Sequence, residues 1–388
     1  MKFGAFKVLH LISNIRNHLI ILLLLVSSHV VDAQKFKENF VDSTDHAFDI
    51  STWLSQAYGF FPVVGLITEP ATGYGAAFGL IHLNKKKELN FEGKPVPPDI
   101  SAVGGAITEN GTWAAILAHK AYWKQDRIRF TGVAGYLSPN LAIYRDGPLG
   151  NTLKFGFNLK GPLFIPSLSF RIKESKSFLG ARYIFMKNTV SFDLPIEGVP
   201  IKPNDIESTL SGLGVLYTLD SRDNTFTPNK GIYSDVSFLV YDNFLGSDME
   251  FLRLDSYIIG FKPVGNRLII GGRFDYRAAF NEPPFYSLPF ITLRGVPAFR
   301  YQGKQLLVLE TEERWDFSNR WSLVAFAGGG KGFEDLKSFN QEDWAYSLGG
   351  GFRYLLAKKF NIYSGIDVAR GPEEWAFYIQ FGHYWNTL

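Results

Sequence analysis

The feature that most constrains this chain is a repeated alternation of apolar and polar residues with a period of two. In residues 266–280, Phe274 and Tyr276 fall on one face. Arg273, Asp275 and Arg277 fall on the other. A helix would distribute these three charges around its circumference, whereas a strand collects them on one side. Similar alternation in residues 152–160, 305–317 and 374–385 predicts an all-β protein.

Composition agrees with a β protein and excludes several other classes. The 388 residues are 16% aromatic and include 38 glycines, which favour pleated surfaces and tight corners. There is no cysteine, so a disulfide framework and Cys-based metal or redox sites are excluded. The formal charge of +3 gives no reason to expect a nucleic acid partner.

The N-terminus has the pattern of a secretory signal peptide. Lys2, Lys7 and Arg16 precede an apolar run over about 19–31, and small residues follow it. We expect cleavage after Ala33, so that residues 1–33 are removed. The alternative is a single uncleaved anchor, although the run is shorter than the roughly 20 residues that span a bilayer.

The length of the alternating segments distinguishes between a soluble exported β protein and a transmembrane β-barrel. Most segments have about 10–13 residues, which is longer than the strands of soluble sheets and close to the length of a tilted strand in a bilayer. An even number of strands is also what bacterial barrels require. The sixteen expected strands are 73–84, 99–109, 112–123, 127–137, 152–160, 163–173, 177–187, 208–219, 230–241, 250–263, 266–280, 305–317, 320–330, 345–356, 359–369 and 374–385.

Connections in the second half of the chain alternate between short and long. Short joints at 174–176, 264–265, 317–319 and 357–358 interleave with 188–207, 242–249, 281–304 and 331–344. Periplasmic turns and external loops of outer-membrane barrels alternate in this way. We therefore predict an antiparallel transmembrane β-barrel of about 16 strands over 73–388. Residues 34–72 are expected to be a short periplasmic or plug segment, which supplies either a plug helix or a pre-barrel strand.

Four fragments carry a family resemblance through their order and separation. They are LYTLDSRDNTFTPNKGIYSDVSF (216–238), LRG (293–295), ETEERW (310–315) and the glycine-rich segment 349–385. Together they resemble the barrel of the BamA/TamA family of outer-membrane proteins, also called bacterial surface antigens. The resemblance implies a long external loop that folds into the lumen. It also implies periplasmic POTRA domains in members that handle polypeptides, and residues 34–72 are too few for one.

The resemblance assigns residues to this lumen loop and its anchor. Arg294 and Gly295 match the arginine and glycine of the family loop. Asp367 matches the inward acid that meets the arginine, and Glu312 with Arg314 matches the inward Glu-x-Arg pair. An arginine suits this position because its planar fork binds carboxylates in two places at once.

Two further observations bear on this anchor. Independently of the resemblance, alternation places Asp367 opposite Ile366 and Val368, on the lumen face. Val296, however, stands where the family commonly has an aromatic residue. The alternative is that Arg294 is a solvated charge in an external loop.

The segment DSRDNTFTPNKG is expected to be a structured periplasmic turn. Asp220 and Asp223 can accept hydrogen bonds from the turn backbone, and Arg222 lies between them. Pro228 fixes a backbone dihedral, and Gly231 restarts the strand. The alternative is an ordinary solvated loop.

The sequence contains no motif for catalysis or for a cofactor. There is no Gly-x-Ser-x-Gly or His-Glu-x-x-His motif, and GGGKG at 328–332 lacks the spacing of a phosphate-binding loop. His82, His119 and His383 are isolated in sequence, so no metal site is expected. Lys85 to Lys87 form either a solvated loop or a contact with anionic lipid.

We therefore expect a non-enzymatic barrel in the bacterial outer membrane, without a cofactor. Its expected function is membrane-protein insertion and assembly or polypeptide translocation. The alternative is a passive channel, or a structural barrel or anchor without insertase activity. The implied partners are outer-membrane lipid, unfolded outer-membrane or exported polypeptides, and a periplasmic chaperone or accessory subunit.

Overall fold

The computed structural model of the chain describes residues 39–56, 59–146, 152–193 and 205–385. The chain divides into two units, Met1–Gln56 and Ala57–Leu388. The described part of the first unit contains the short helix α3 (Ser51–Gln56). Within the described residues, no helix has both the length and the apolar character needed to cross a membrane. The expected signal peptide, 1–33, lies outside the described residues.

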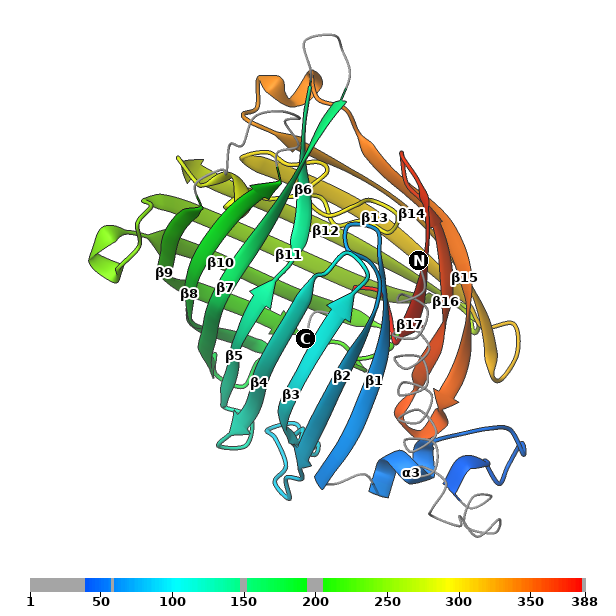
Figure 1. Cartoon of the computed structure of the whole chain (residues 1–388). Coiled ribbons are helices and arrows are strands. Elements are labelled where there is room, and N and C mark those ends of the chain that lie inside the picture. Colours follow the sequence, from blue (N-terminus) through cyan, green and yellow to red (C-terminus); the bar gives the residue numbers. More distant parts are fainter. Residues whose placement is uncertain (1–38, 57–58, 147–151, 194–204, 386–388) are drawn as a thin grey trace, which may run out of the picture. The chain divides into compact units, whose positions relative to one another are not determined.

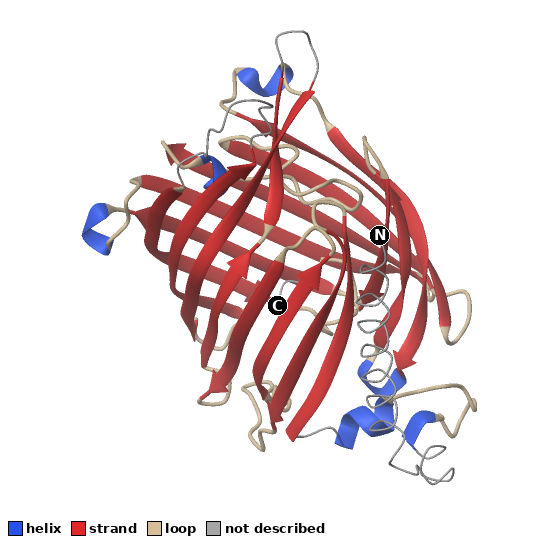
Figure 2. Ribbon diagram, viewed as in Figure 1, coloured by secondary structure: helices blue, strands red, loops and turns tan. Residues whose placement is uncertain are grey.

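The second unit is an antiparallel β-barrel, and strands make up nearly all of it (Figures 1 and 2). Among the described residues, four 3-10 turns lie in its connections: η1 (Asn243–Leu245), η2 (Phe285–Ser287), η3 (Ser338–Asn340) and η4 (Lys358–Phe360). The strands are β1 (Gly59–Glu69), β2 (Gly73–Asn84), β3 (Asp99–Thr108), β4 (Trp113–Trp123), β5 (Ile128–Ser138), β6 (Asn140–Asp146), β7 (Thr152–Arg171), β8 (Ser177–Asp193), β9 (Ile206–Asp220), β10 (Gly231–Tyr241), β11 (Phe251–Val264), β12 (Leu268–Asn281), β13 (Gln305–Trp315), β14 (Trp321–Phe333), β15 (Ala345–Ala357), β16 (Ile362–Arg370) and β17 (Trp375–Phe381).

Neighbouring strands pair in chain order, with one exception at β5 and β6. These two strands pair with successive parts of β7: β6 with 152–158 and β5 with 161–170. They therefore share one position in the wall. Counted by position, the 17 strands form a wall of about 16, which confirms the predicted fold class.

The predicted strands differ from the observed ones in three places: at β1, at β7 and at β6, which was not predicted. The number of wall positions stays the same, because β6 shares one position with β5. β1 lies within 34–72, so the barrel sheet begins at Gly59 rather than at Gly73. The segment 34–72 therefore contains a pre-barrel strand, and it also contains the short helix α3. Residues 152–160 and 163–173 are one strand, β7, instead of two. Gly161 and Pro162 resemble a break in sequence, but they lie where the partner of β7 changes from β6 to β5. A proline without an N–H is tolerated where a ladder is already interrupted.

The two faces of the wall have opposite character. Outward positions are mostly apolar and more exposed, as in alternate residues at the start of β14, while the intervening inward positions are buried. Exposed tryptophans mark both ends of the outward face, as the aromatic girdles of membrane barrels do. They are Trp113, Trp344 and Trp375 at one end and Trp123, Trp315 and Trp321 at the other.

β1 begins and β17 ends at the same end of the barrel, which also carries the short turns 265–267, 316–320 and 358–361. Because outer-membrane barrels place their short turns in the periplasm, this is the periplasmic end, and the other is the external end. β1 and β17 lie side by side (Figure 1). Among the described residues, no backbone ladder joins them, although each is fully paired with its other neighbour.

Candidate functional site

The long connection between β12 and β13, residues 282–304, packs against the inner face of the barrel wall. Phe290 and Gln302 form an isolated antiparallel β-bridge, and the N–H of Ile291 donates to the carbonyl of Tyr301. The two halves of the segment therefore run antiparallel to each other. A tight turn forms the tip, where the N–H of Val296 donates to Leu293. We call this segment the lumen loop.

Gly295 is required at the tip by its backbone and by its surroundings. Its φ of 77° lies in the left-handed region, which side chains other than glycine rarely adopt. A Cβ atom at this position would lie 2.8 Å from the backbone nitrogen of Gly371, in the β16–β17 connection. The N–H of Gly295 donates to the hydroxyl of Tyr378 in β17 at 2.8 Å. The tip is therefore held directly against the last two strands.

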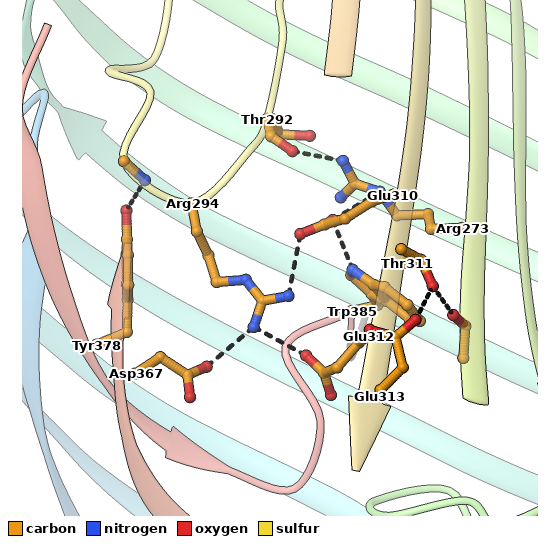
Figure 3. Close-up of polar contacts among 12 residues, drawn as sticks. Arg273, Thr292, Arg294, Glu310, Thr311, Glu312, Glu313, Asp367, Tyr378 and Trp385 are labelled. Carbon is orange, nitrogen blue, oxygen red and sulfur yellow. Dashed lines mark hydrogen bonds and ion pairs between the residues drawn. The ribbon is translucent and has the colours of Figure 1, made fainter. Parts of the chain in front are cut away.

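Arg294 lies fully buried among three carboxylates of the inner wall (Figure 3). Its Nη1 donates to Glu312 at 2.8 Å and to Asp367 at 2.9 Å. Its Nη2 donates to Glu310 at 3.0 Å. Burial opposes the charge of the guanidinium, but the three carboxylates outweigh this effect and raise the pKa of Arg294 above its ordinary value. The arginine stays charged at every physiological pH.

Aromatic rings enclose the guanidinium of Arg294. Its central carbon lies 3.4 Å from the ring centroid of Phe326 and 4.6 Å from that of Tyr384. Stacking of this kind suits the flat arginine fork and adds a cation–π attraction. The rings also separate the ion pairs from water, which strengthens them.

The charges of this cluster balance. Asp367 also accepts two hydrogen bonds from Arg353 of β15, at 2.5 Å and 2.9 Å. Glu310 lies 3.4 Å from Arg273 of β12. Three arginines therefore face three carboxylates, which avoids the large cost of an unpaired buried charge. We call this group the lumen cluster: Arg273, Arg294, Glu310, Glu312, Arg353 and Asp367.

The residues that follow β17 turn inward and complete the lumen cluster. The indole Nε1 of Trp385 donates to Glu310 at 2.6 Å. The hydroxyl of Tyr257 donates to the backbone carbonyl of Trp385 at 2.9 Å. The lumen loop, the inner wall and the segment after β17 therefore meet at one group of side chains.

The structure distributes the residues expected at the anchor over two places. Arg294, Gly295, Glu312 and Asp367 lie together. Arg314 lies elsewhere, because its guanidinium donates to Asp316 and to the Asn229 side chain. Glu312 and Arg314 share the inward face of β13, but their side chains bond to different partners.

Sequence reasoning missed several members of the site. Glu310 shares the inward parity of Glu312, so alternation marks it, although the resemblance does not name it. Arg353, Tyr378 and Trp385 are inward or terminal residues whose contacts depend on how the strands are registered. Val296, where the family commonly has an aromatic, is buried in an aliphatic cluster with Leu293 and Val308 among its members.

The segment between β9 and β10, residues 221–230, is internally hydrogen-bonded as a structured turn. Arg222 donates to Asp220 at 2.8 Å and 2.9 Å, and the Asp223 side chain accepts from two N–H groups, those of residues 229 and 230. Gly231 has a φ of 105°, and a Cβ there would lie 2.4 Å from the carbonyl oxygen of Ser221. We call this stretch the periplasmic segment.

The periplasmic segment also reaches strands on another side of the lumen. Asn224 donates to the carbonyl of Phe360 at 2.6 Å, and Asn361 donates to the carbonyl of Thr227 at 3.0 Å. The N–H of His383 donates to the carbonyl of Phe226 at 2.9 Å. These contacts carry the segment from β9 and β10 to the β15–β16 turn and the end of β17. Pro228 lines a small cavity beneath it.

Comparison with known families identifies the domain. A model described as the Omp85 superfamily domain matches residues 108–290. The chain contains an Omp85 superfamily domain. The matched part of the Omp85 domain runs from the end of β3 to the lumen loop and stops four residues before Arg294. The protein is a bacterial outer-membrane β-barrel.

Solved structures share the fold of this barrel. BamA from Haemophilus ducreyi lacking POTRA domains 1–3 has a TM-score of 0.57 and 14% identity, over 84% of this chain and 70% of that one. CdiB from Escherichia coli has a TM-score of 0.53 and 12% identity, over 84% and 62%. CdiB from Acinetobacter baumannii has a TM-score of 0.53 and 10% identity, over 83% and 59%. This chain thus spans about three fifths of both CdiB structures. No curated protein sequence matches it significantly.

Proposed function

We propose that this Omp85 barrel inserts or translocates polypeptides, and that an unfolded chain pairs with the barrel at the seam between β1 and β17. The observation that carries the proposal is the seam itself. The two strands lie side by side, yet no backbone pair joins them in the part of the chain that the structure describes. An unpaired edge in lipid is costly and accepts a further strand by β-augmentation.

The edge of β1 that faces the seam can be identified from its neighbours. Glu109 donates its N–H to the carbonyl of Tyr74, and its side chain accepts the N–H of Tyr74, so the peptide groups of Tyr74 face β3. Thr68 is the β1 partner of Tyr74. Because the N–H and C=O of Tyr74 point away from β1, this is a non-hydrogen-bonded pair, and the N–H and C=O of Thr68 point away from β2, toward the seam. The other β1 residues with this orientation are Phe60, Pro62, Val64 and Leu66.

Pro62 gives this edge a built-in gap. Proline has no N–H, so β1 offers no donor to the seam at this position. Prolines in sheets are confined to edges for this reason. A continuous ladder between β1 and β17 is therefore weakened at Pro62, while the remaining groups of β1 stay available to an incoming strand.

The lumen cluster supports the proposal because it ties the lumen loop to the strands of the seam. Gly295 bonds to Tyr378 in β17, and Arg294 bonds to Asp367 in β16. We propose that Arg294, Gly295, Glu312 and Asp367 anchor the loop and thereby fix β16 and β17 while β1 moves. In the periplasmic segment, Asp220, Arg222, Asp223, Pro228 and Gly231 have the role of a structured turn, held to the wall through Arg314.

The passive channel is the less favoured alternative, because two segments occupy the lumen. The lumen loop lies against β13, β16 and β17, and the periplasmic segment reaches across to the β15–β16 turn and the end of β17. The cavity between them, lined by Thr227, Glu312 and Arg353 among others, measures about 20 Å³. This is room for about one water molecule.

Reconstitution tests the proposed function. The purified protein is placed in lipid vesicles, a urea-unfolded outer-membrane barrel is added, and its insertion is followed by mobility of unheated samples on gels. We expect insertion several-fold faster than in empty vesicles. Equal rates together with ion conductance would favour a passive channel, and equal rates without conductance would favour a structural barrel.

A further inference from the structure

A hollow of about 390 Å³ lies on the outward face of β1 to β5 and β7. Exposed apolar side chains line most of it, including Leu80, Leu117 and Phe164. In an outer-membrane barrel this face contacts the acyl chains of the bilayer. An apolar lining alone would therefore call for no explanation.

The hollow also contains a row of polar residues, which does call for one. His82 in β2 pairs across the ladder with Ser101 in β3, and Ser101 pairs with His119 in β4. The hydroxyl of Ser101 and Nδ1 of His119 lie 2.9 Å apart. Among the described residues, the imidazole nitrogens of His82 have no hydrogen-bond partner. Three hydrogen-bonding side chains are thus in line on a surface that faces lipid.

Aromatic rings bound this row on both sides. The ring centroids of Phe60 and His82 are 4.5 Å apart, and those of Phe130 and His119 are 6.1 Å apart. The next position after His119 is Gly132, and the ring of Phe130 lies over it, since a Cβ at Gly132 would be 2.9 Å from that ring. The row therefore lies between two rings, along the wall of the hollow.

The position of the row along the strands matches a lipid headgroup. His82 lies two residues before the end of β2, and Ser101 lies two residues after the start of β3, both at the periplasmic end. Exposed cations follow in the adjacent connections, at Lys87, Lys124 and Arg127. Polar donors and positive charge attract the phosphate of a lipid in the periplasmic leaflet.

We propose that this hollow is a binding site for one phospholipid of the periplasmic leaflet. His82, Ser101 and His119 hydrogen-bond its phosphate, and its acyl chains lie along Leu80 and Leu117. Because Phe60 belongs to β1, the bound lipid adjoins the first strand of the seam. The site is independent of the proposed insertase function, since neither its geometry nor its test involves a polypeptide.

Native mass spectrometry of the full chain in detergent tests this site. Dioleoylphosphatidylglycerol is titrated against dioleoylglycerol, which has the same acyl chains and no phosphate. We expect a first binding event that is about tenfold tighter for the phospholipid, as hydrogen bonds to a charged group give. Equal binding of the two lipids would overturn the proposal without any variant.

Variants then test whether the phospholipid binds in this hollow. His82→Leu combined with His119→Leu is expected to weaken phosphatidylglycerol about tenfold and leave dioleoylglycerol unchanged. The control is Ser177→Ala with Tyr217→Phe, because these hydroxyls form another outward pair, 3.0 Å apart, at the periplasmic end and outside the hollow. Heat-dependent gel mobility confirms folding of each variant. Unchanged phospholipid binding by the histidine variant, or equal weakening by the control, would contradict the proposed site.

Discussion

Nη1 of Arg294 lies 2.9 Å from a carboxylate oxygen of Asp367, a residue 73 positions further along the chain. The same nitrogen lies 2.8 Å from Glu312. A loop and two wall strands thus share one guanidinium. Replacing the arginine or one of the carboxylates alone would leave a buried charge unpaired. The destabilisation caused by such a charge is much larger than the net contribution of the ion pair to stability.

We expect Arg294→Lys to destabilise the barrel by about 3 kcal/mol, because an ammonium cannot serve three separated carboxylates as a planar fork does. Urea unfolding in detergent, followed by gel mobility of unheated samples, measures the change. Arg300→Lys is the matched control, since Arg300 is in the same loop and pairs with the partly exposed Glu373 at 2.9 Å. It should cost less than about 1 kcal/mol. Equal effects of the two substitutions would refute a special role for Arg294.

Gly295→Ala should destabilise the barrel more than Gly246→Ala does. Both glycines have positive φ, 77° and 87°. Only at Gly295 would the added Cβ lie 2.8 Å from a backbone atom; at Gly246 it would meet nothing within 4 Å. The backbone strain common to both costs roughly 1 kcal/mol, and the clash at Gly295 adds to it. The urea midpoints of the two variants provide the comparison, and identical midpoints would show that the tip is not packed as described.

A cysteine pair at Ile291 and Gly330 should form a disulfide in the folded protein. A Cβ at Gly330 would lie 3.3 Å from Cγ2 of Ile291, which places the two Cβ atoms within disulfide range. The chain has no other cysteine. The control pair is Ile291 with Gly329, because neighbouring strand residues point to opposite faces. Mild oxidation followed by mass spectrometry should give a crosslink only in the first pair; a crosslink in the control or in neither pair would place the loop elsewhere.

Trp385→Phe should destabilise the barrel by about 1–3 kcal/mol, since it removes a buried donor to a carboxylate and leaves Glu310 short of one bond. Trp375→Phe is the control, because the Trp375 side chain is 67% exposed on the outward face. Its effect should stay within about 0.5 kcal/mol. The two free energies of unfolding, measured in the same detergent, decide whether the segment after β17 belongs to the lumen cluster.

Alternation in the sequence predicted the barrel because it depends on only one property, the two-residue period of a strand. It marked charges such as Glu310 as inward before any partner was known. It failed where a proline interrupts the pattern for a local reason. Pro62 interrupts the alternation of β1, which was therefore not counted among the barrel strands, although an edge strand tolerates a proline. Pro162 divides β7 in sequence but not in space.

Side-chain contacts between neighbouring strands were harder to predict from the sequence than the positions of the strands themselves. The pairing of Ser101 with His119 depends on register, and a slip of one residue would place one of them on the opposite face. The histidines therefore looked isolated. The position of Trp385 in the lumen likewise follows from the inward turn after β17. The two-residue alternation along a strand does not predict such a turn. The role of Arg294 and Asp367 as an anchor stays a prediction until the variants above are measured.

The most direct measurement of the central claim is the insertion rate of an unfolded barrel after the seam has been locked. Thr68→Cys and Phe377→Cys place cysteines on the outward faces of β1 and β17, where the ring of Tyr74 already contacts Phe377 at 5.7 Å. A bismaleimide crosslinker joins them. The control joins Phe274→Cys and Leu309→Cys, which pair within the continuous β12–β13 ladder. We predict that the seam crosslink abolishes accelerated insertion and that the control crosslink leaves it unchanged. Full acceleration with the seam locked would contradict the account.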